Sequence, residues 1–130
     1  MPRVRTAVTM TVKPSDLDEV VGIFQTFIKG VEERDPGTLR YEYFVDDGDP
    51  MTIHVSEEYA DSEAHLAHYT HLDMQAVGRL VELVTLGTPH FFGDPSPQER
   101  ELLKGFGDVQ YHLPLVSIDQ PVPTVRAAPA

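Results

Sequence analysis

The sequence predicts an α+β domain in which helices cover one face of an antiparallel sheet. Segments in which apolar and polar residues alternate indicate strands, and segments with apolar residues at helical spacing lie between them. Two of the expected strands are joined by a short turn, which indicates a hairpin. The expected order is strand, helix, strand, strand, helix, helix, strand, then a further helix and strand, which is close to a ferredoxin-like plan.

The first two elements have the clearest patterns. Residues 4–12 predict a half-buried strand with Val4, Thr6, Val8, Met10 and Val12 on one side. Ser15 and Asp18 form a capping-box pattern before apolar residues at helical spacing, which predicts an amphipathic helix. The segment Arg34-Asp35-Pro36-Gly37 should end this helix, because proline cannot continue it and glycine supplies a turn.

The next segment predicts a hairpin. Residues 39–45 and 51–59 alternate on either side of a Gly-containing turn at 46–50. We expect one face to pack beneath the first helix through Leu39, Tyr41, Tyr43, Val45, Met51, Ile53 and Val55. The other face is mixed and carries Arg40, Glu42, Phe44, Thr52, His54 and Ser56. That face could be wet, or it could pack against the same face of a second copy.

Two consecutive helices are expected after the hairpin. The first should run from Asp61 to about Thr70. The segment 70–73 could cap the second, whose apolar residues extend to Val84. The eight acidic residues from Glu42 to Glu63 are expected to form a solvated rim around the hairpin and the start of the first of these helices.

The C-terminal part predicts a short strand, a helix and a last strand. Residues 90–92 can form the short strand. The segment 96–99 combines an N-cap serine, a proline at the first helical position and a capping-box glutamate, so it opens a helix that Gly105 closes. Residues 109–118 read as the last strand, in which Pro114 suggests an edge position or a bulge.

Length and tail composition predict one domain. A chain of 130 residues supports one hydrophobic core, so a single domain is expected over residues 1–118. The segment 119–130 contains Pro121, Pro123 and Pro129 and few large apolar residues. We expect it to be disordered or loosely docked.

Composition excludes several classes of function. The chain has 21 Asp and Glu against 10 Lys and Arg, a net charge of -11, which argues against nucleic-acid binding and electrostatic attraction to membranes. The absence of cysteine excludes disulfides, thiolate metal sites and cysteine nucleophiles. No apolar run suits a membrane span, and the first residues do not form a signal peptide. We expect a cytoplasmic protein.

Two segments resemble the antibiotic biosynthesis monooxygenase (ABM) domain family. Residues 35–44, which begin Asp35-Pro36-Gly37-Thr38, are similar to the Pro-Gly-Thr turn that leads into the second strand of that family. Residues 57–66 are similar to the acidic and aromatic end of its third strand and to its helix containing His-Leu. The resemblance covers about residues 4–92, and the expected elements follow the order of the family.

The resemblance implies a dimeric α+β barrel, in which two ferredoxin-like sheets face each other with helices outside, and hence a homodimer. It also implies cofactor-independent oxygenation of phenolic or quinol-type aromatics, while some relatives degrade haem or act only as binding modules. Haem-degrading relatives rely on an Asn on the first strand and a Trp further on. This chain has Thr9 and Thr11 on that strand and no Trp, so haem degradation is not expected. The family often has a second His about five residues after the His-Leu start, where the candidates here are His68 and His71.

Oxygenation without a cofactor requires a substrate that itself becomes the reductant. A base removes a phenolic proton, and the electron-rich anion reacts with oxygen in a dry pocket with hydrogen-bond donors and aromatic walls. A helical wheel for residues 61–70 sets the inward direction by Leu66, Tyr69 and Leu72. His65 shares this direction, while His68 sits at its border and His71 lies nearly opposite.

The predicted site is a pocket between the sheet and the helices of each subunit. We assign His65, as the base, with Tyr69 and Tyr43 as catalytic residues, and Tyr41, Phe24, Phe27 and His68 as substrate-binding residues. Any of them could instead be an ordinary core residue whose polar tip is satisfied. The spacing of the three histidines also suits a metal, but they spread over about 120° of the helix and no carboxylate partner can be named. We therefore expect no metal and no cofactor.

The preferred function is a small cofactor-independent monooxygenase that oxidises a phenolic, quinol or polyketide-like aromatic substrate with O2. Two alternatives stay open: a non-catalytic ligand-binding or regulatory module of the same fold, and a cyclase or isomerase that uses the same pocket without oxygen. A cavity reached by His65 would favour an enzyme. A space filled by Phe24, Phe27, Tyr41 and Tyr43 would favour a binding or structural role.

Overall fold

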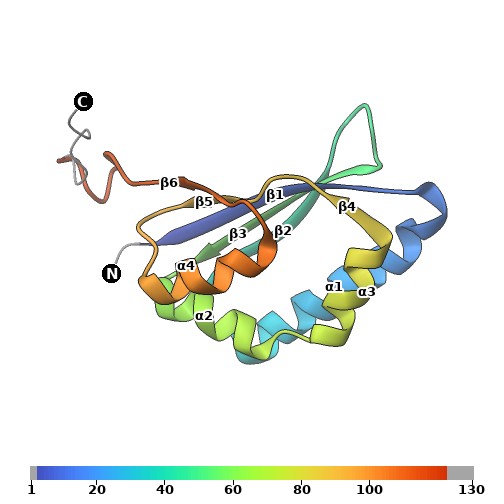
Figure 1. Cartoon of the computed structure of the whole chain (residues 1–130), viewed down its shortest axis with the longest axis horizontal. Coiled ribbons are helices and arrows are strands. Elements are labelled where there is room, and N and C mark those ends of the chain that lie inside the picture. Colours follow the sequence, from blue (N-terminus) through green and yellow to red (C-terminus); the bar gives the residue numbers. More distant parts are fainter. Residues whose placement is uncertain (1–2, 123–130) are drawn as a thin grey trace.

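Every α-helix in the described part of the chain packs on the same face of a six-stranded sheet (Figure 1). This computed structural model describes residues 3–122. The opposite face of the sheet carries no helix of these residues, so the chain has two layers and one open sheet face. The predicted α+β class, with helices on one face, is confirmed.

The sheet is built around its first strand. The strands are β1 (Val4–Val12), β2 (Thr38–Val45), β3 (Thr52–Tyr59), β4 (Val84–Leu86), β5 (His90–Phe92) and β6 (Gln110–His112). Their order is β2-β3-β1-β5-β6, and β4 also pairs with β1. The pairs of β1 with β3, β4 and β5, and of β2 with β3, are antiparallel, whereas β5 and β6 run parallel. The sheet was predicted to be antiparallel throughout. The parallel pair of β5 and β6 instead makes it mixed at one edge.

Local side-chain caps begin three of the helices. The α-helices are α1 (Leu17–Arg34), α2 (Ser62–His71), α3 (Met74–Leu83) and α4 (Pro97–Leu103), with short 3-10 turns at Pro14–Asp16 and Lys104–Phe106. Asp61 accepts from the Ala64 amide at the start of α2, and Asp73 accepts from two amides at the start of α3. At α4 the predicted capping box of Ser96 and Glu99 is present in both directions.

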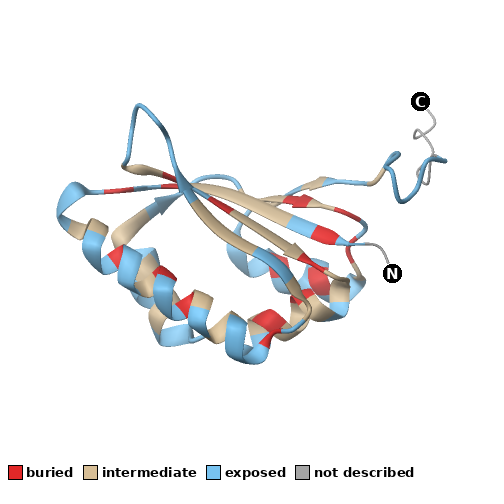
Figure 2. Cartoon of the chain, turned by 180° about the vertical axis from the view of Figure 1, so that it is seen from behind, coloured by how far each residue is buried: buried red, intermediate tan, exposed pale blue. Residues whose placement is uncertain are grey.

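Two clusters of buried apolar residues join the layers (Figure 2). The larger one, between α1 and the sheet, contains Met10, Val12, Val20, Phe24, Phe27, Ile53 and Val55. The smaller one contains Val4, Tyr59, Phe91 and Leu103, the last of which comes from α4. Partly buried Tyr41 and Tyr43 pack on the first cluster and Tyr69 on the second, so a band of tyrosines connects the two.

The predicted capping box at Ser15 is wrong. The chain forms a 3-10 turn at Pro14–Asp16 that runs directly into α1, and the N-cap residue Asp16 has helical backbone angles and makes no side-chain cap. The 3-10 turn supplies an acceptor for one of the first free amides of α1, because the Leu17 amide donates to the Pro14 carbonyl.

Some strand limits differ from the prediction. Val84, predicted inside a helix, begins β4, which pairs with the end of β1. The last strand ends at His112 and does not reach Ile118, because Pro114 has no amide hydrogen to continue a ladder. Leu39 and Val45 are 45% and 56% exposed, not packed beneath α1, because they lie near the two ends of the edge strand β2.

The segment after β6 is only partly described. Residues 113–122 form neither helix nor strand, and residues 123–130 of the predicted tail lie outside the described residues. Within residues 3–122, no helix has the length and apolar character that crossing a membrane requires.

Replacing Ser96 by Ala should lower the free energy of unfolding by about 1 kcal/mol, because the capping bond to the Glu99 amide is lost. Ser15→Ala is the matched control, and it should stay within about 0.5 kcal/mol of the parent because Ser15 is exposed and α1 has no side-chain cap. Urea unfolding followed by circular dichroism measures both. Equal losses in the two variants would contradict the assignment of the caps.

Candidate functional site

A cavity of about 160 Å³ lies between the sheet and the helices. Most of its lining is apolar and includes Met10, Phe24, Phe27, Val55, Leu72, Val77, Leu80 and Phe91. The polar and aromatic side chains that reach it include Tyr41, Tyr43, Glu57, His68 and Tyr69. Because a protein cavity of about 150 Å³ can hold benzene, this one has room for one aromatic ring.

Helix α2 turns two of its three histidines inward. His65 and His68 are buried, and His71 remains partly exposed at the end of the helix. This corrects the helical wheel for His68, which it placed at the border, whereas the inward His65 and the outward His71 agree with the wheel. The wheel took Leu66 as an inward residue, but Leu66 is only partly buried, because α2 is packed against β2, β3 and α4 with His65 and His68 at the contact.

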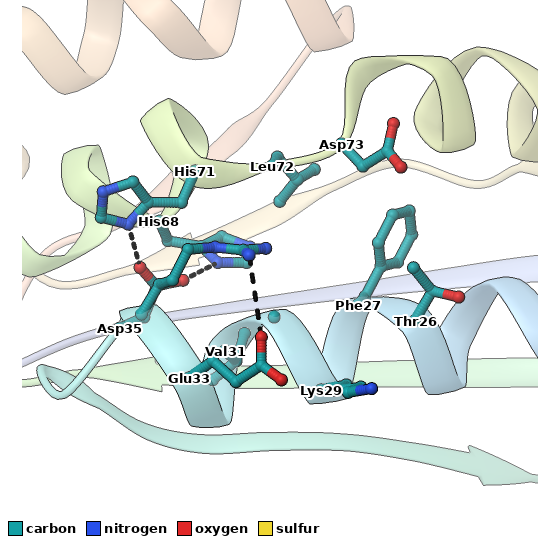
Figure 3. Close-up of a pocket in the computed structure, with 12 residues that line it drawn as sticks. Thr26, Phe27, Lys29, Val31, Glu33, Asp35, His68, His71, Leu72 and Asp73 are labelled. Carbon is teal, nitrogen blue, oxygen red and sulfur yellow. Dashed lines mark hydrogen bonds and ion pairs between the residues drawn. The ribbon is translucent and has the colours of Figure 1, made fainter.

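His68 and His71 share one carboxylate (Figure 3). The Nδ1 atom of His68 lies 3.1 Å from Asp35 Oδ2, and the Nδ1 atom of His71 lies 2.5 Å from Asp35 Oδ1. The side chains of His68 and Asp35 are 3% and 4% exposed, whereas that of His71 is 39% exposed. Since a carboxylate only accepts, each imidazole donates through Nδ1 and keeps Nε2 for another partner.

The turn after α1 places Asp35 against α2. The Asp35 amide donates to the Val31 carbonyl at the end of the helix, and the Thr38 amide donates back to the Asp35 carbonyl. Gly37 allows close contact, because a Cβ atom there would lie 2.5 Å from the Ala64 Cβ. The Ala60 amide also donates to the Gly37 carbonyl, at 2.9 Å. The sequence Asp-Pro-Gly therefore holds the carboxylate beneath the histidines.

Strand β3 brings a second carboxylate to the cavity. Glu57 is 15% exposed, accepts a short hydrogen bond from the Tyr59 hydroxyl, and has its Oε1 atom 3.8 Å from His68 Nε2. This corrects the prediction that all acids from Glu42 to Glu63 form a solvated rim. Glu57 lies in phase with Val55 and Tyr59 in the alternating strand, so it points toward the helices.

The tyrosines of the cavity are held in their protonated form. Burial, followed by the charge of Glu57, raises the pKa of Tyr41 and of Tyr59 far above 10. Burial also raises the pKa of Tyr43 and of Tyr69. The Tyr43 hydroxyl donates to the Tyr41 hydroxyl at 3.2 Å, and the Tyr43 ring stacks on Phe24 at 3.8 Å. The Tyr41 hydroxyl can thus donate its own proton to an oxygen of a bound ring, while Tyr43 orients it.

His65 forms a separate buried pair. Its Nδ1 atom lies 2.7 Å from Glu99 Oε2, and both side chains are fully buried. Its ring stacks on Tyr59 at 4.5 Å and tilts against Tyr69 at 4.9 Å. Its Nε2 atom is buried and has no hydrogen-bond partner among residues 3–122. Burial opposes ionisation of Glu99, but the hydrogen bonds from His65, Ser62 and the Ser96 amide lower its pKa overall.

The structure brings most of the predicted site residues to one place. Phe24, Phe27, Tyr41, Tyr43, His68 and Tyr69 all line the cavity, so those aromatic residues surround a space and do not fill it. His65 contacts Tyr69 but is not part of the lining. The imidazole that reaches the cavity is therefore that of His68 and not, as predicted, that of His65. The chemical roles of these residues stay predictions.

Sequence reasoning missed Asp35, Glu57 and Glu99 as partners of the histidines. Asp35 and Glu99 were read only as a turn residue and a capping residue. A signal was present for Glu57, because the two-residue period places it on the inner face of β3. Among residues 3–122, no group of three or more His, Asp or Glu side chains is arranged to hold a metal ion.

A second hollow lies on the outer side of His68 (Figure 3). It has a volume of about 330 Å³ and lies between the last turns of α1 and the junction of α2 with α3. Phe27, His68 and Leu72 line both this outer groove and the inner cavity. These three side chains therefore separate the inner cavity from the groove, and His71 and Asp35 line the groove side.

Residues 3–79 match the family model described as antibiotic biosynthesis monooxygenase. The match covers more than half of the chain, and the chain belongs to the ABM family, as the resemblance in its sequence predicted. The matched region contains Asp35, Glu57 and the three histidines of α2. No curated protein sequence matches the chain.

Solved structures share the fold. The structure of MupZ from Pseudomonas fluorescens has a TM-score of 0.73 at 17% identity, and the match covers 98% of this chain and 100% of that one. SnoaB, a cofactor-independent oxygenase from Streptomyces nogalater, has a TM-score of 0.61 at 14% identity, with coverage of 74% and 96%. A conserved protein from Methanosarcina mazei Go1 has a TM-score of 0.58 at 18% identity, with coverage of 67% and 90%. At such identities the likeness shows the fold alone.

The lowered pKa of Glu99 makes stability depend on pH. Its bonds favour the carboxylate in the folded state, so their contribution is complete above the ordinary value of 4.5 and is lost as the pH falls through the lower folded value. Glu99→Gln should cost about 1.5–3 kcal/mol at pH 7, the range for a hydrogen bond to a charged group. It should also flatten the fall in stability between about pH 5 and pH 3.

Urea unfolding at several pH values tests this expectation. The matched control is Glu101→Gln on the same helix, because Glu101 is exposed and pairs only with Lys104 among the interactions described. The control should keep the parent's pH dependence. If the Glu99 variant also kept it, the pair with His65 would not stabilise the folded state as described.

Proposed function

We propose that this ABM-family chain is a cofactor-independent monooxygenase that oxidises a phenolic or quinol-type ring with O2, and that His68 is the base. The observation that carries the proposal is the position of His68, which lines a ring-sized apolar cavity while its Nδ1 atom is bound to buried Asp35. His68 is preferred to the sequence-based choice, His65, because His65 does not reach the cavity.

His68 has the arrangement of a general base. With Nδ1 donating to Asp35, the free Nε2 atom can accept the proton of a substrate hydroxyl. Asp35 holds the ring in the tautomer whose Nε2 atom accepts. Glu57, whose Oε1 atom is 3.8 Å from Nε2, favours the imidazolium that forms, since a carboxylate near a cation favours the charged form.

The remaining groups suit the oxygen step. The anion left by deprotonation transfers electrons to O2, and the new carbon–oxygen bond gives a peroxide at the ring. His68 returns its proton to the peroxide, which then loses water and leaves a carbonyl, so one oxygen atom stays in the product and one leaves in water. In this proposal the Tyr41 hydroxyl donates to the ring oxygen and the Tyr43 hydroxyl donates to that of Tyr41, and their raised pKa keeps both protonated.

A cyclase or isomerase is the second candidate. The pair of His68 and Asp35, with Glu57 on the other side of the imidazole, can move a proton between two positions of a substrate without oxygen. Product formation without O2 uptake would favour this candidate over the oxygenase. Binding of the ring without turnover would favour a ligand-binding module.

Oxygen uptake with anthrone or dihydroxynaphthalene substrates tests the proposed activity. His68→Gln should lower kcat/KM by about 10²- to 10⁴-fold, the usual contribution of a general base. Tyr41→Phe should lower it by about 10²-fold, because the donor to the developing oxyanion is lost.

The control is His54→Gln, since His54 is exposed and does not line the cavity. It should keep the parent rate. His65→Gln is measured in parallel, together with thermal unfolding to separate loss of activity from loss of fold. Unchanged turnover in His68→Gln, with a loss in an equally stable His65→Gln, would return the role of base to His65.

We also propose that the open face of the sheet packs against a second copy of the chain. Phe44 is exposed on that face, where a ladder of stacked rings runs through His90, His112 and Phe92. The segment after β6 adds further exposed apolar side chains at Leu113, Leu115, Val116 and Ile118. Apolar side chains that stay exposed on a sheet face without helices support an interface there. The homodimer expected from the family resemblance accounts for it.

The double variant Leu115→Asp/Ile118→Asp should weaken self-association about tenfold or more, because each buried aliphatic side chain contributes about 1.5–3 kcal/mol. Met74→Asp, which changes an exposed residue in the helix layer, should leave association unchanged. Sedimentation equilibrium over a range of protein concentrations measures both. A monomeric parent chain would contradict the proposed dimer.

A further inference from the structure

One carboxylate serves two histidines that differ in their access to solvent (Figure 3). The two oxygens of Asp35 each accept from one Nδ1 atom, so His68 and His71 compete for the same negative charge. His68 faces the inner cavity and is 3% exposed, while His71 lies on the outer groove and is 39% exposed. The proposed function uses His68 and gives no role to His71.

Several charged and titratable groups surround this cluster. From β3, Glu57 faces His68 Nε2 at 3.8 Å, which is longer than a hydrogen bond, and its Oε1 atom accepts from Tyr59. The rings of Tyr41, Tyr59 and Tyr69 lie 5.2, 5.6 and 5.5 Å from the His68 ring. The groove beside His71 carries Lys29, Glu33, Arg34 and Asp73, of which Glu33 and Arg34 pair with each other. Asp35 is thus the carboxylate in direct hydrogen-bond contact with both imidazoles.

A single negative charge can balance only one imidazolium. When one of two closely coupled groups is protonated, the second takes up its proton less readily, and the two protons bind in separate steps. Water reaches His71 but scarcely reaches His68. Protonation of exposed His71 is therefore less costly than protonation of His68, where a charge would lose its hydration.

We propose that His71 is a positioning residue for the base His68. Asp35 pairs with one imidazolium at a time, and His71 takes that proton from solvent, so His68 stays unprotonated and able to accept the proton of the substrate. This inference rests on the proposed function in one respect, the use of His68 as the base. Without His71, the negative charge of Asp35 would act on His68 alone. His68 should then bind a proton at a higher pH. As the pH falls, its unprotonated form should therefore disappear at a higher pH than in the parent.

Nuclear magnetic resonance of the full chain with ¹⁵N-labelled histidine tests the coupling without any substrate. In the parent, the ¹⁵N signals of His68 should move in two steps, one of which coincides with the titration of His71. In His71→Gln, the His68 signals should move in one step, at a pH higher by about one unit. Asp35→Asn should shift the His68 titration to lower pH. The control His54→Gln removes another histidine bonded to an aspartate, Asp46, and should leave His68 unchanged.

The pH profile of kcat/KM tests the consequence for activity. In His71→Gln, the acid limb should move to higher pH by about one unit while the rate at high pH stays close to that of the parent, a pattern that a structural role would not produce. A His68 titration that is identical in the parent and in His71→Gln would overturn the inference, whatever the enzyme activity. If the coupling is present but no O2 is consumed, the proposed oxygenase fails and the proton-sharing pair stands.

Discussion

The burial of imidazoles between α2 and the sheet is the constraint on which the rest of the site depends. A buried ring nitrogen without a partner costs about 1–3 kcal/mol, so His65 and His68 require carboxylates from elsewhere in the chain. Glu99 comes from α4, Asp35 from the turn after α1, and Glu57 from β3. These pairs connect α2 to three other elements. The same contacts that stabilise the helix therefore also determine the chemistry of the cavity.

The carboxylates also set the state of the aromatic residues around them. The charge of Glu57 adds to burial in raising the pKa of Tyr41 and Tyr59, so these hydroxyls can donate but do not ionise. The stacking of Tyr43 on Phe24 fixes a second hydroxyl at the cavity, where it meets that of Tyr41. The result is an apolar space, bounded on one side by donors and on another by an imidazole held by Asp35. Such a space favours an anion formed inside it over an anion that enters from water.

The two faces of the sheet carry different sets of side chains. The cavity and all of the paired histidines of α2 lie on the helix side, whereas the strand registers place Phe44 and the ring ladder of His90, Phe92 and His112 on the open side. A second copy on the open face would thus leave one complete site in each subunit.

Local patterns in the sequence were enough to determine the order of the elements other than β4, the limits of β1 and β5, the capping box of α4 and most of the aromatic wall. These features are local, because a strand alternates by two and a cap is closed within four residues. The sequence did not determine the extent of the last strand or the cap of α1, where a proline and a 3-10 turn changed the local pattern. It also could not identify which imidazole of α2 faces the cavity. That position depends on contacts between residues more than 30 positions apart, such as His68 with Asp35 and His65 with Glu99, and only the packing of α2 against its neighbours decided it.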